Sequence, residues 1–282
     1  MQIIRDLYTL RATLFSLRKD GGRIALVPTM GALHEGHMSL MRAAKAHAEH
    51  VVTSIFVNPK QFGVNEDLDA YPRQEAQDAA MLEAEGVAVL WAPTMDVMYP
   101  PGFTTSISVS GVREGLCGAA RPGHFDGVAT VVCKLFNQVC PDVALFGEKD
   151  YQQLAVIRRM AIDLDMGLEI IGVPTARAED GLALSSRNAY LSPDERARAA
   201  ELPRAMREAI EIIEDGGAIP TALEGLRQRL TQAGFAPVEY SELRDATSLE
   251  SLVDLNAPAR LLVAARLGKT RLIDNMPLNP VN

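Results

Sequence analysis

The sequence predicts an α/β protein, in which a parallel sheet covered by helices is followed by a smaller α+β region. Through the first half of the chain, short and almost continuously apolar runs alternate with helical segments. This pattern is typical of parallel strands that are buried on both faces. After about residue 175 the pattern changes to helices rich in Ala, Arg and Glu and then to three short strands. We therefore expect one domain over residues 1–175 and a smaller one over residues 176–282.

The elements of the first domain follow from apolar periodicity and from the Pro, Gly and Asn residues that end each run. A stripe of apolar side chains predicts an opening helix over residues 3–19. Strands are expected at 23–27, 51–57, 87–91, 143–146 and 168–172. Helices are expected at 39–48, in the polar stretch up to residue 85, at 126–139 and at 150–164. Residues 105–110 interrupt this alternation and indicate a short edge strand.

The second domain is expected to contain two helices and three strands. The helices are predicted at 193–215 and 221–233. The strands are predicted at 238–243, 260–265 and 271–274.

Composition limits the class of protein. The 282 residues are 48% hydrophobic and 23% charged, values typical of a globular chain that needs no disulfide or metal to hold its core. No apolar stretch reaches the roughly 18 residues of a membrane span, and charges interrupt the apolar N-terminus as they would not in a signal peptide. Three cysteines without a CxxC pair indicate core residues rather than a zinc site. These features predict an acidic cytoplasmic protein, and the net charge of −8 argues against nucleic acid.

The most informative segment is VPTMGALHEGHMSLMRA at residues 27–43, where an expected strand runs through a turn into a helix. Gly31 and Gly36 allow a ligand to approach the backbone closely, because they have no Cβ. The first turn of a helix offers N–H groups and the positive end of the helix dipole, a combination that binds phosphate. His34 and His37 share one helical face, where their imidazoles could donate hydrogen bonds or a proton.

Other interpretations of this segment fit less well. A zincin needs two histidines four residues apart, and here the spacing is three. The segment is neither GxGxxG nor a Walker A loop, since no GK[ST] is present. A structural alternative remains, in which His34 and His37 only cap the helix. The HxGH form directly after an apolar strand argues against that alternative.

HxGH after the first strand resembles the signature of the nucleotidyltransferase superfamily, whose Rossmann-like domain binds ATP at this helix N-terminus. Members carry a second loop of Lys, Ser and Arg for the β- and γ-phosphates, and Leu184-Ser-Ser-Arg187 could be that loop. Four further blocks occur in order: FVNPKQF at 56–62, RPGHFDGVATVVCKLFN at 121–137, FGEKDYQQ at 146–153 and DGLALSSRNAYL at 180–191. Together with PTMGALHEGH, and with RLIDN at 271–275, they are similar to the pantothenate synthetase (pantoate–β-alanine ligase) family over nearly the whole chain.

The resemblance implies an ATP-dependent ligase that joins (R)-pantoate to β-alanine in two steps. In the first, the pantoate carboxylate attacks the α-phosphorus of ATP, giving pantoyl adenylate and pyrophosphate. In the second, the β-alanine amine attacks the acyl carbon and releases AMP and pantothenate. Neither step needs a covalent enzyme intermediate, so catalysis would rest on positioning and charge stabilisation.

The matched motifs also imply the site residues. The catalytic residues would be His34, His37, Lys149, Ser185, Ser186 and Arg187. The ATP-binding residues would be Met30, Gly31, Ala32, Leu33, His34, Glu35, Gly36, His37, Gly147, Glu148, Lys149, Asp150, Ala176, Leu184, Ser185, Ser186 and Arg187. A lysine supplies a point charge and an arginine a bidentate fork, and both suit phosphate oxygens.

Pantoate would be bound by Gln61 and Gln153, because an amide can donate to a carboxylate and accept from a hydroxyl. His124 lies in another family block, and both a functional and a structural role stay open for it. No direct protein ligand to a metal is expected. Mg²⁺ is implied by ATP, whose phosphates it bridges, with Asp78 and Asp150 as possible outer-shell carboxylates. The resemblance further implies a homodimer without nucleic-acid or membrane partners, in which residues 176–282 form a lid over ATP.

Two other functions are disfavoured by particular residues. A nucleotidyltransferase that leaves the nucleotide on its product does not account for FVNPKQF and GEKDYQQ. A non-catalytic nucleotide-binding module has no physical need for His34, His37, Lys149 and Arg187 together. The acidic net charge does not exclude a nucleotide, because local cations and a helix N-terminus set the field of a site.

Overall fold

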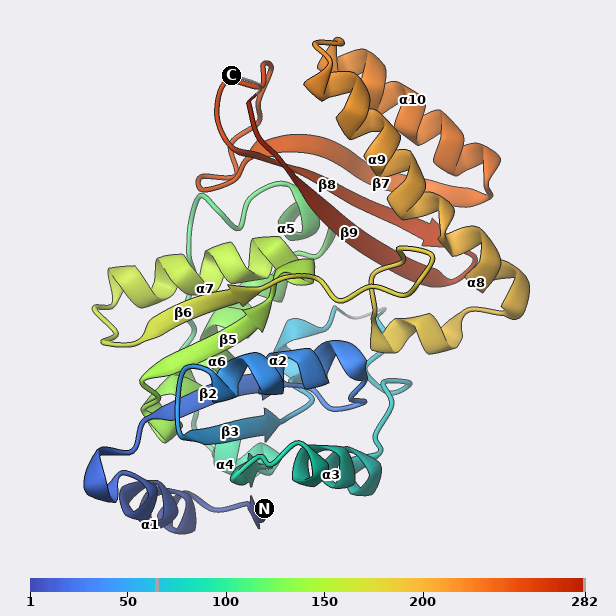
Figure 1. Ribbon diagram of the computed structural model, residues 1–282. Helices are drawn as coiled ribbons and strands as arrows, with labels where there is room; N and C mark the ends of the chain where they lie inside the picture. Colours follow the sequence, from blue (N-terminus) through green and yellow to red (C-terminus); the bar gives the residue numbers. More distant parts are fainter. Residues whose placement is uncertain (64–65, 281–282) are drawn as a thin grey trace. The chain divides into compact units, whose positions relative to one another are not determined.

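The computed structural model describes residues 1–63 and 66–280, and the chain divides into two compact units (Figure 1). The first unit comprises Met1–Arg113, Arg121–Gly147 and Gln153–Pro174. The second comprises Glu114–Ala120, Glu148–Gln152 and the chain from Thr175 onward. Two short segments that precede residue 175 in the sequence therefore belong to the second unit.

The first unit is built on a parallel sheet, as the sequence predicts, but the sheet has a sixth strand, at Gln2–Ile4, that was not predicted from the sequence. Its strands are β1 (Gln2–Ile4), β2 (Ile24–Thr29), β3 (His50–Ile55), β4 (Val89–Trp91), β5 (Val143–Gly147) and β6 (Glu169–Val173). They lie in the order β1-β4-β3-β2-β5-β6, and all neighbouring pairs are parallel. The Rossmann-like fold class is thus confirmed for this part of the chain.

In the described part of the chain, seven helices lie in the segments between these strands. They are α1 (Leu7–Leu17), α2 (Glu35–Lys45), α3 (Glu75–Ala84), α4 (Met95–Met98), α5 (Leu116–Ala120), α6 (His124–Val139) and α7 (Tyr151–Asp163). Alternate strand residues such as Val27 and Leu145 pack with α2 in one buried cluster. On the opposite face, the ring of Phe146 lies 6.3 Å from that of Phe136 in α6. Both faces of the sheet are covered, which explains why its strands are almost continuously apolar.

The strand order creates one topological switch point, between β2 and β5. From β2 the chain continues to β3 and β4 on one side of the sheet, whereas β5 continues to β6 on the other side. β2 and β5 are neighbours, with Ala25 opposite Val143. In open α/β sheets, ligands bind beyond the carboxyl ends of the strands at such a point. The HxGH segment follows β2 directly, so the fold puts it at the expected edge.

The second unit is an α+β structure with a three-stranded antiparallel sheet. It contains α8 (Pro193–Ala199), α9 (Glu201–Glu214), α10 (Ile219–Gln232), β7 (Phe235–Asp245), β8 (Ala259–Leu267) and β9 (Thr270–Leu278). The strand order is β7-β8-β9, and α9 and α10 lie along the sheet (Figure 1). Phe235, Leu230 and Met206 are fully buried in the core between these helices and the sheet.

Three predicted elements are wrong. The expected helix over residues 3–19 is shorter, because Gln2–Ile4 pairs with β4 as an edge strand and Asp6 caps the helix by accepting from Thr9 N–H at 2.8 Å. Residues 105–110 form no strand, and Ile107 N–H donates instead to Thr130 Oγ1 at 2.9 Å. The expected helix over 193–215 is broken at Ala200, because Pro203 has no N–H to continue the α8 ladder.

The three cysteines differ in burial. Cys117 is buried, as expected for a core residue, but Cys133 is half-buried and Cys140 is exposed at the C-cap of α6. The core prediction is therefore wrong for Cys140. Among the described residues, no helix is both long enough and apolar enough to cross a lipid bilayer.

Trp91 offers a test of the sheet's packing. Its fully buried indole donates from Nε1 to Gln138 Oε1 at 2.9 Å. We expect Trp91→Phe to lower the free energy of unfolding by about 2–3 kcal/mol, because it leaves a buried acceptor without its donor. Adding Gln138→Leu should recover part of this loss, as both polar partners are then gone. Urea unfolding followed by circular dichroism measures both variants, and a double variant no more stable than the single one would contradict this packing.

Candidate active site

The turn between β2 and α2 has a strained backbone that is held by a buried carboxylate. Gly31 and Ala32 adopt φ values of 81° and 51°, in the left-handed region that favours glycine. Asp78 of α3 is 1% exposed, and its two oxygens accept from the N–H groups of Ala32 and Leu33, both at 2.9 Å. Asp78 therefore fixes the turn, and each of its two carboxylate oxygens already accepts from a main-chain N–H.

His34 and His37 cap α2 reciprocally. His34 Nδ1 accepts from Gly36 N–H at 3.1 Å, and His37 Nδ1 accepts from His34 N–H at 3.3 Å. The two ring centroids lie 4.2 Å apart. Because each Nδ1 is an acceptor, the proton of each neutral ring is on Nε2. Capping thus uses Nδ1 of each ring and leaves Nε2 out, so the structural role does not exclude the predicted catalytic one.

The side chain of Glu35 pairs with another residue of α2. It is exposed and forms an ion pair with Arg42 further along α2, with Nη1 and Oε1 2.6 Å apart. The hydrogen bond from Arg42 lowers the pKa of the Glu35 carboxyl. A contribution of Glu35 to a ligand site would therefore come from its backbone N–H in the first turn of α2.

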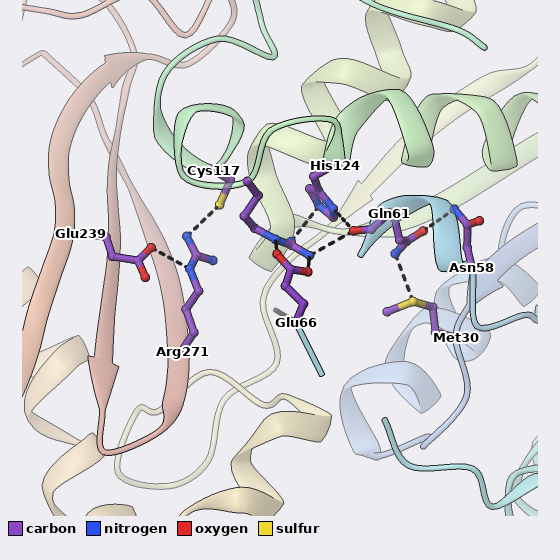
Figure 2. A network of polar contacts seen from close by, with 9 residues as sticks. Met30, Asn58, Gln61, Glu66, Cys117, His124, Glu239 and Arg271 are labelled. Atoms are coloured by element: carbon purple, nitrogen blue, oxygen red, sulfur yellow. Dashed lines mark hydrogen bonds and ion pairs between the residues drawn. The ribbon is translucent and has the colours of Figure 1, made fainter. Parts of the chain in front are cut away.

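Gln61 lies in a short 3-10 turn, η2 (Pro59–Gln61), after the carboxyl end of β3. Figure 2 shows its amide between Met30 and Asn58. Nε2 contacts Met30 Sδ at 3.0 Å, and Oε1 accepts from Asn58 Nδ2 at 3.0 Å. Asn58 is itself held by Tyr99, whose hydroxyl donates to Asn58 Oδ1 at 2.9 Å. The structure thus brings Gln61 next to the first residue of the predicted ATP-binding segment.

The main chain of Gln61 is anchored by the RPGHFDG segment (Figure 2). Its carbonyl oxygen lies 2.8 Å from His124 Nδ1 and 3.3 Å from Arg121 Nη2. Arg121 Nη1 lies 2.9 Å from His124 Nε2 and can only donate, so His124 carries its proton on Nδ1 and donates to Gln61. Glu66 accepts from Arg121 at 2.6 and 2.5 Å. His124 therefore has a positioning role at Gln61.

The Glu66 carboxyl is charged in this network. Burial alone would raise its pKa, but the hydrogen bonds and the charge of Arg121 outweigh burial and hold the pKa below its ordinary value. The Glu66–Arg121 pair thus stabilises the folded state above the ordinary pKa of a glutamate, and this stabilisation is lost as the pH falls through the lowered value.

Gly127 allows α6 to pack closely against η2, the turn that carries Gln61. A Cβ at this position would overlap the Lys60 carbonyl and lie 2.7 Å from Gln61 N. Asn58 Nδ2 also donates to the Gly127 carbonyl at 3.1 Å. Any larger side chain would push η2, and Gln61 with it, away from α6.

The second unit carries the other predicted phosphate contacts. Glu148–Asp150 forms a 3-10 turn, η3, immediately after β5, and Lys149 Nζ lies 3.7 Å from Asp150 Oδ2. Residues 176–184 double back on themselves, so that Leu184 N–H donates to the Ala176 carbonyl at 2.9 Å. Ser185 Oγ accepts from Arg187 N–H at 3.3 Å and caps η4 (Ser186–Tyr190). Ala176, Leu184 and the SSR segment are thus adjacent, as the motif requires.

Gln153 is the first residue of the part of α7 that belongs to the first unit. It is half-buried in the first turn of α7, whereas its neighbour Gln152 is buried and ties down another segment by accepting from Cys117 N–H at 3.0 Å. The structure leaves the role of Gln153 as a prediction from the motif alone.

Sequence reasoning did not identify the residues that support the predicted site segments through hydrogen bonds or close packing. These are Asn58, Arg121, Gly127, Arg177, Asp274 and Asn275. The signal that could have found several of them is their position inside the matched blocks. In the described parts of the chain, no group of three His, Cys, Asp or Glu side chains is arranged to hold a metal ion.

The parallel sheet, with an HxGH-capped helix directly after β2, is that of an α/β enzyme. The sequence profile of the family described as Pantoate-beta-alanine ligase matches residues 2–277, and the chain belongs to that family. It is 64% identical to the pantothenate synthetase of Novosphingobium aromaticivorans, over 99% of this chain and 100% of the relative. It is 58% identical to that of Caulobacter vibrioides, over 97% of each chain.

Solved structures agree with this membership. The crystal structure of pantothenate synthetase from Thermus thermophilus matches with a TM-score of 0.94 at 46% identity, over 99% of this chain and 100% of that one. The pantoate-beta-alanine ligase of Francisella tularensis, complexed with beta-gamma ATP and beta-alanine, matches with a TM-score of 0.84 at 35% identity. That match covers 98% of this chain and 97% of the other.

Gly127 tests whether the tight approach of α6 is needed. Gly127→Ala should lower the free energy of unfolding by about 1–3 kcal/mol, because the new Cβ would overlap backbone atoms of η2. Gly225→Ala is the matched control, since Gly225 is also helical but meets no atom within 4 Å and should gain up to about 1 kcal/mol. Urea denaturation compares them, and equal stabilities of the two variants would refute the close contact.

Proposed function

We propose that the chain catalyses the ATP-dependent condensation of (R)-pantoate with β-alanine to pantothenate, through pantoyl adenylate, releasing AMP and pyrophosphate. The observation that carries this proposal is the 3.0 Å contact between Gln61 Nε2 and Met30 Sδ. This contact brings the turn before the HxGH helix, whose N–H groups suit phosphate, next to the Gln61 amide, which can bind a hydroxy acid. Both lie at one edge of the first unit's sheet. The beta-gamma ATP and beta-alanine named for the Francisella tularensis structure support the same reaction.

In the first step, a carboxylate oxygen of pantoate bonds to the α-phosphorus of ATP. The bond from that phosphorus to the bridging oxygen breaks, and pyrophosphate leaves with the electron pair. His34 and His37 would donate from Nε2 to phosphate oxygens as their charge grows. Lys149, Ser185, Ser186 and Arg187 would bind the pyrophosphate oxygens with two positive charges and two hydroxyls.

In the second step, the amine of β-alanine attacks the acyl carbon of pantoyl adenylate. The amide bond forms, the bond from the acyl carbon to the phosphate oxygen breaks, and AMP leaves as the amine loses a proton. Gln61 and Gln153 would hold the pantoyl group so that its acyl carbon faces the amine. The oxygen that pantoate placed on phosphorus stays with AMP.

Mg²⁺ would enter this site with ATP. The described residues offer no three-ligand cluster, and Asp78 is committed to backbone N–H groups. These facts fit an ion held mainly by phosphate oxygens and water, with Asp150 beside Lys149 as the candidate carboxylate of η3, since Glu148 is paired with Arg260. Bound in this way, Mg²⁺ would neutralise phosphate charge. A cytoplasmic homodimer stays a prediction from the resemblance.

The adenylation step can be tested alone. With ATP, Mg²⁺ and pantoate but no β-alanine, the protein should exchange labelled pyrophosphate into ATP, whereas omission of pantoate should abolish exchange. AMP should accumulate only when pantoate and β-alanine are both present. Robust AMP formation without either substrate would contradict the ligase function, and a stable nucleotide-linked product would favour the nucleotidyltransferase alternative.

Removal of one transition-state donor should slow adenylation strongly. We expect His37→Ala and Lys149→Ala each to lower kcat by about 100-fold or more, as loss of a single such donor does in other enzymes. Exchange rates at saturating ATP and pantoate measure the effect. His47→Ala and Lys269→Ala serve as matched controls, because both side chains are exposed and outside the motifs. A wild-type rate for either test variant would remove that residue from the mechanism.

A further inference from the structure

Two neighbouring polar residues of β9 are buried in the second unit, and the proposed reaction leaves both without a role. Asp274 and Asn275 are each 2% exposed. Burial of a carboxylate or an amide is costly unless its hydrogen bonds are complete. The partners of these two side chains therefore show what the strand must hold in place.

Asn275 binds the main chain of the Lys149 turn. Its Nδ2 donates to the carbonyl of Glu148 at 2.8 Å and to the carbonyl of Lys149 at 3.0 Å. Its Oδ1 accepts from Arg260 Nη1 at 2.9 Å, and Arg260 Nη2 also donates to Glu148 Oε2 at 2.8 Å. Arginine can only donate and carbonyls can only accept, so the orientation of this amide is fixed. Only an amide satisfies all three partners at once.

Asp274 binds the loop that leads to the SSR segment. Its carboxylate, whose side chain has no exposed surface, accepts from both terminal nitrogens of Arg177 at 2.7 and 2.9 Å. Arg177 Nη1 also donates to the Gly181 carbonyl at 3.0 Å, across the doubled-back segment between Ala176 and Leu184. This bidentate pair thus fixes the backbone from which Ser185, Ser186 and Arg187 project.

The two residues face opposite sides of one strand. Successive side chains of a strand point to opposite faces. Asp274 shares its face with Leu272 and Met276, which belong to the core of the second unit. Asn275 shares the other face with Arg260 of β8. β9 contacts both η3 and η4, so one rigid strand links the Lys149 turn to the SSR loop.

We propose that Asp274 and Asn275 are positioning residues for ATP, which set the spacing between Lys149 and the Ser185–Arg187 segment. This inference rests on the proposed function, because it takes both segments to bind phosphates of the same nucleotide. Neither residue needs to touch ATP. A loss of either side chain would let one phosphate-binding segment move against the other, which weakens ATP binding more than pantoate binding.

The test uses Asn275→Asp, which keeps the acceptor for Arg260 but turns a carboxylate oxygen toward two carbonyls. We expect the KM for ATP to rise about tenfold. The KM for pantoate should stay within about twofold, because Gln61 is held by other residues of the first unit. Asn137→Asp is the matched control, since Asn137 is exposed on α6 and donates only within its own helix. Both KM values of that control should equal those of the wild type.

A second variant tests the role of Asp274, and it keeps the proposal testable if the Asn275→Asp protein does not fold. Arg177→Lys keeps a positive charge beside Asp274 but cannot reach both carboxylate oxygens and the Gly181 carbonyl together. It should raise the KM for ATP in the same selective way. A purely structural role would lower the fraction of active protein, and hence the apparent kcat, with both KM values unchanged.

The outcomes separate this inference from the proposed function. If the wild type forms no AMP with ATP, pantoate and β-alanine, the proposed function fails. If the wild type is active and a folded Asn275→Asp protein has a wild-type KM for ATP, the positioning role of Asn275 is overturned. The same result for Arg177→Lys overturns the positioning role of Asp274. A parallel rise in both KM values would also overturn it, because the effect would not be specific to the nucleotide.

Discussion

Hydrogen bonds from buried side chains to the main chain of loops are the interactions on which the rest of this structure depends. Each candidate binding segment is irregular backbone, and a buried N–H or carbonyl without a partner costs about 1–3 kcal/mol. Asp78, His124 and Asn275 supply those partners to the β2–α2 turn, the Gln61 turn and the Lys149 turn respectively. Preorganised loops of this kind can stabilise charge without reorganising during the reaction.

The same arrangement explains how an acidic protein could bind a nucleotide and a carboxylate. The net charge of −8 is a sum over the whole chain. Within the first unit, the first turn of α2 offers its helix dipole and two imidazole Nε2–H groups. Within the second unit, the predicted phosphate-binding segments carry the positive side chains of Lys149 and Arg187. In each unit a buried carboxylate is already paired, since Asp274 of the second unit binds Arg177 and Asp78 of the first accepts from main-chain N–H groups. Local geometry therefore sets the sign of the field.

The sequence predicts the class of the fold and the residues that line the site better than it predicts what supports them. Apolar runs such as residues 143–146 identify buried strands, and HxGH after a strand identifies the helix N-terminus. Residues 2–4 escape this approach, because an edge strand of three residues has too little periodicity. The roles of Asn275 and Gly127 could not be predicted in this way, because they depend on residues distant in sequence. Asn275 contacts Glu148, 127 residues earlier, and Gly127 of α6 packs against Lys60. The strand order likewise depends on pairing that periodicity does not encode.

Transfer of an isotopic label tests the proposed chemistry most directly. Pantoate labelled with ¹⁸O in its carboxylate would be converted with ATP and β-alanine, and the AMP and pyrophosphate would be analysed by mass spectrometry. If the carboxylate attacks the α-phosphorus, one ¹⁸O atom appears in the phosphate of AMP and none in pyrophosphate. Unlabelled AMP, or label found only in inorganic phosphate, would mean that pantoate is activated by another route and would contradict the adenylate mechanism.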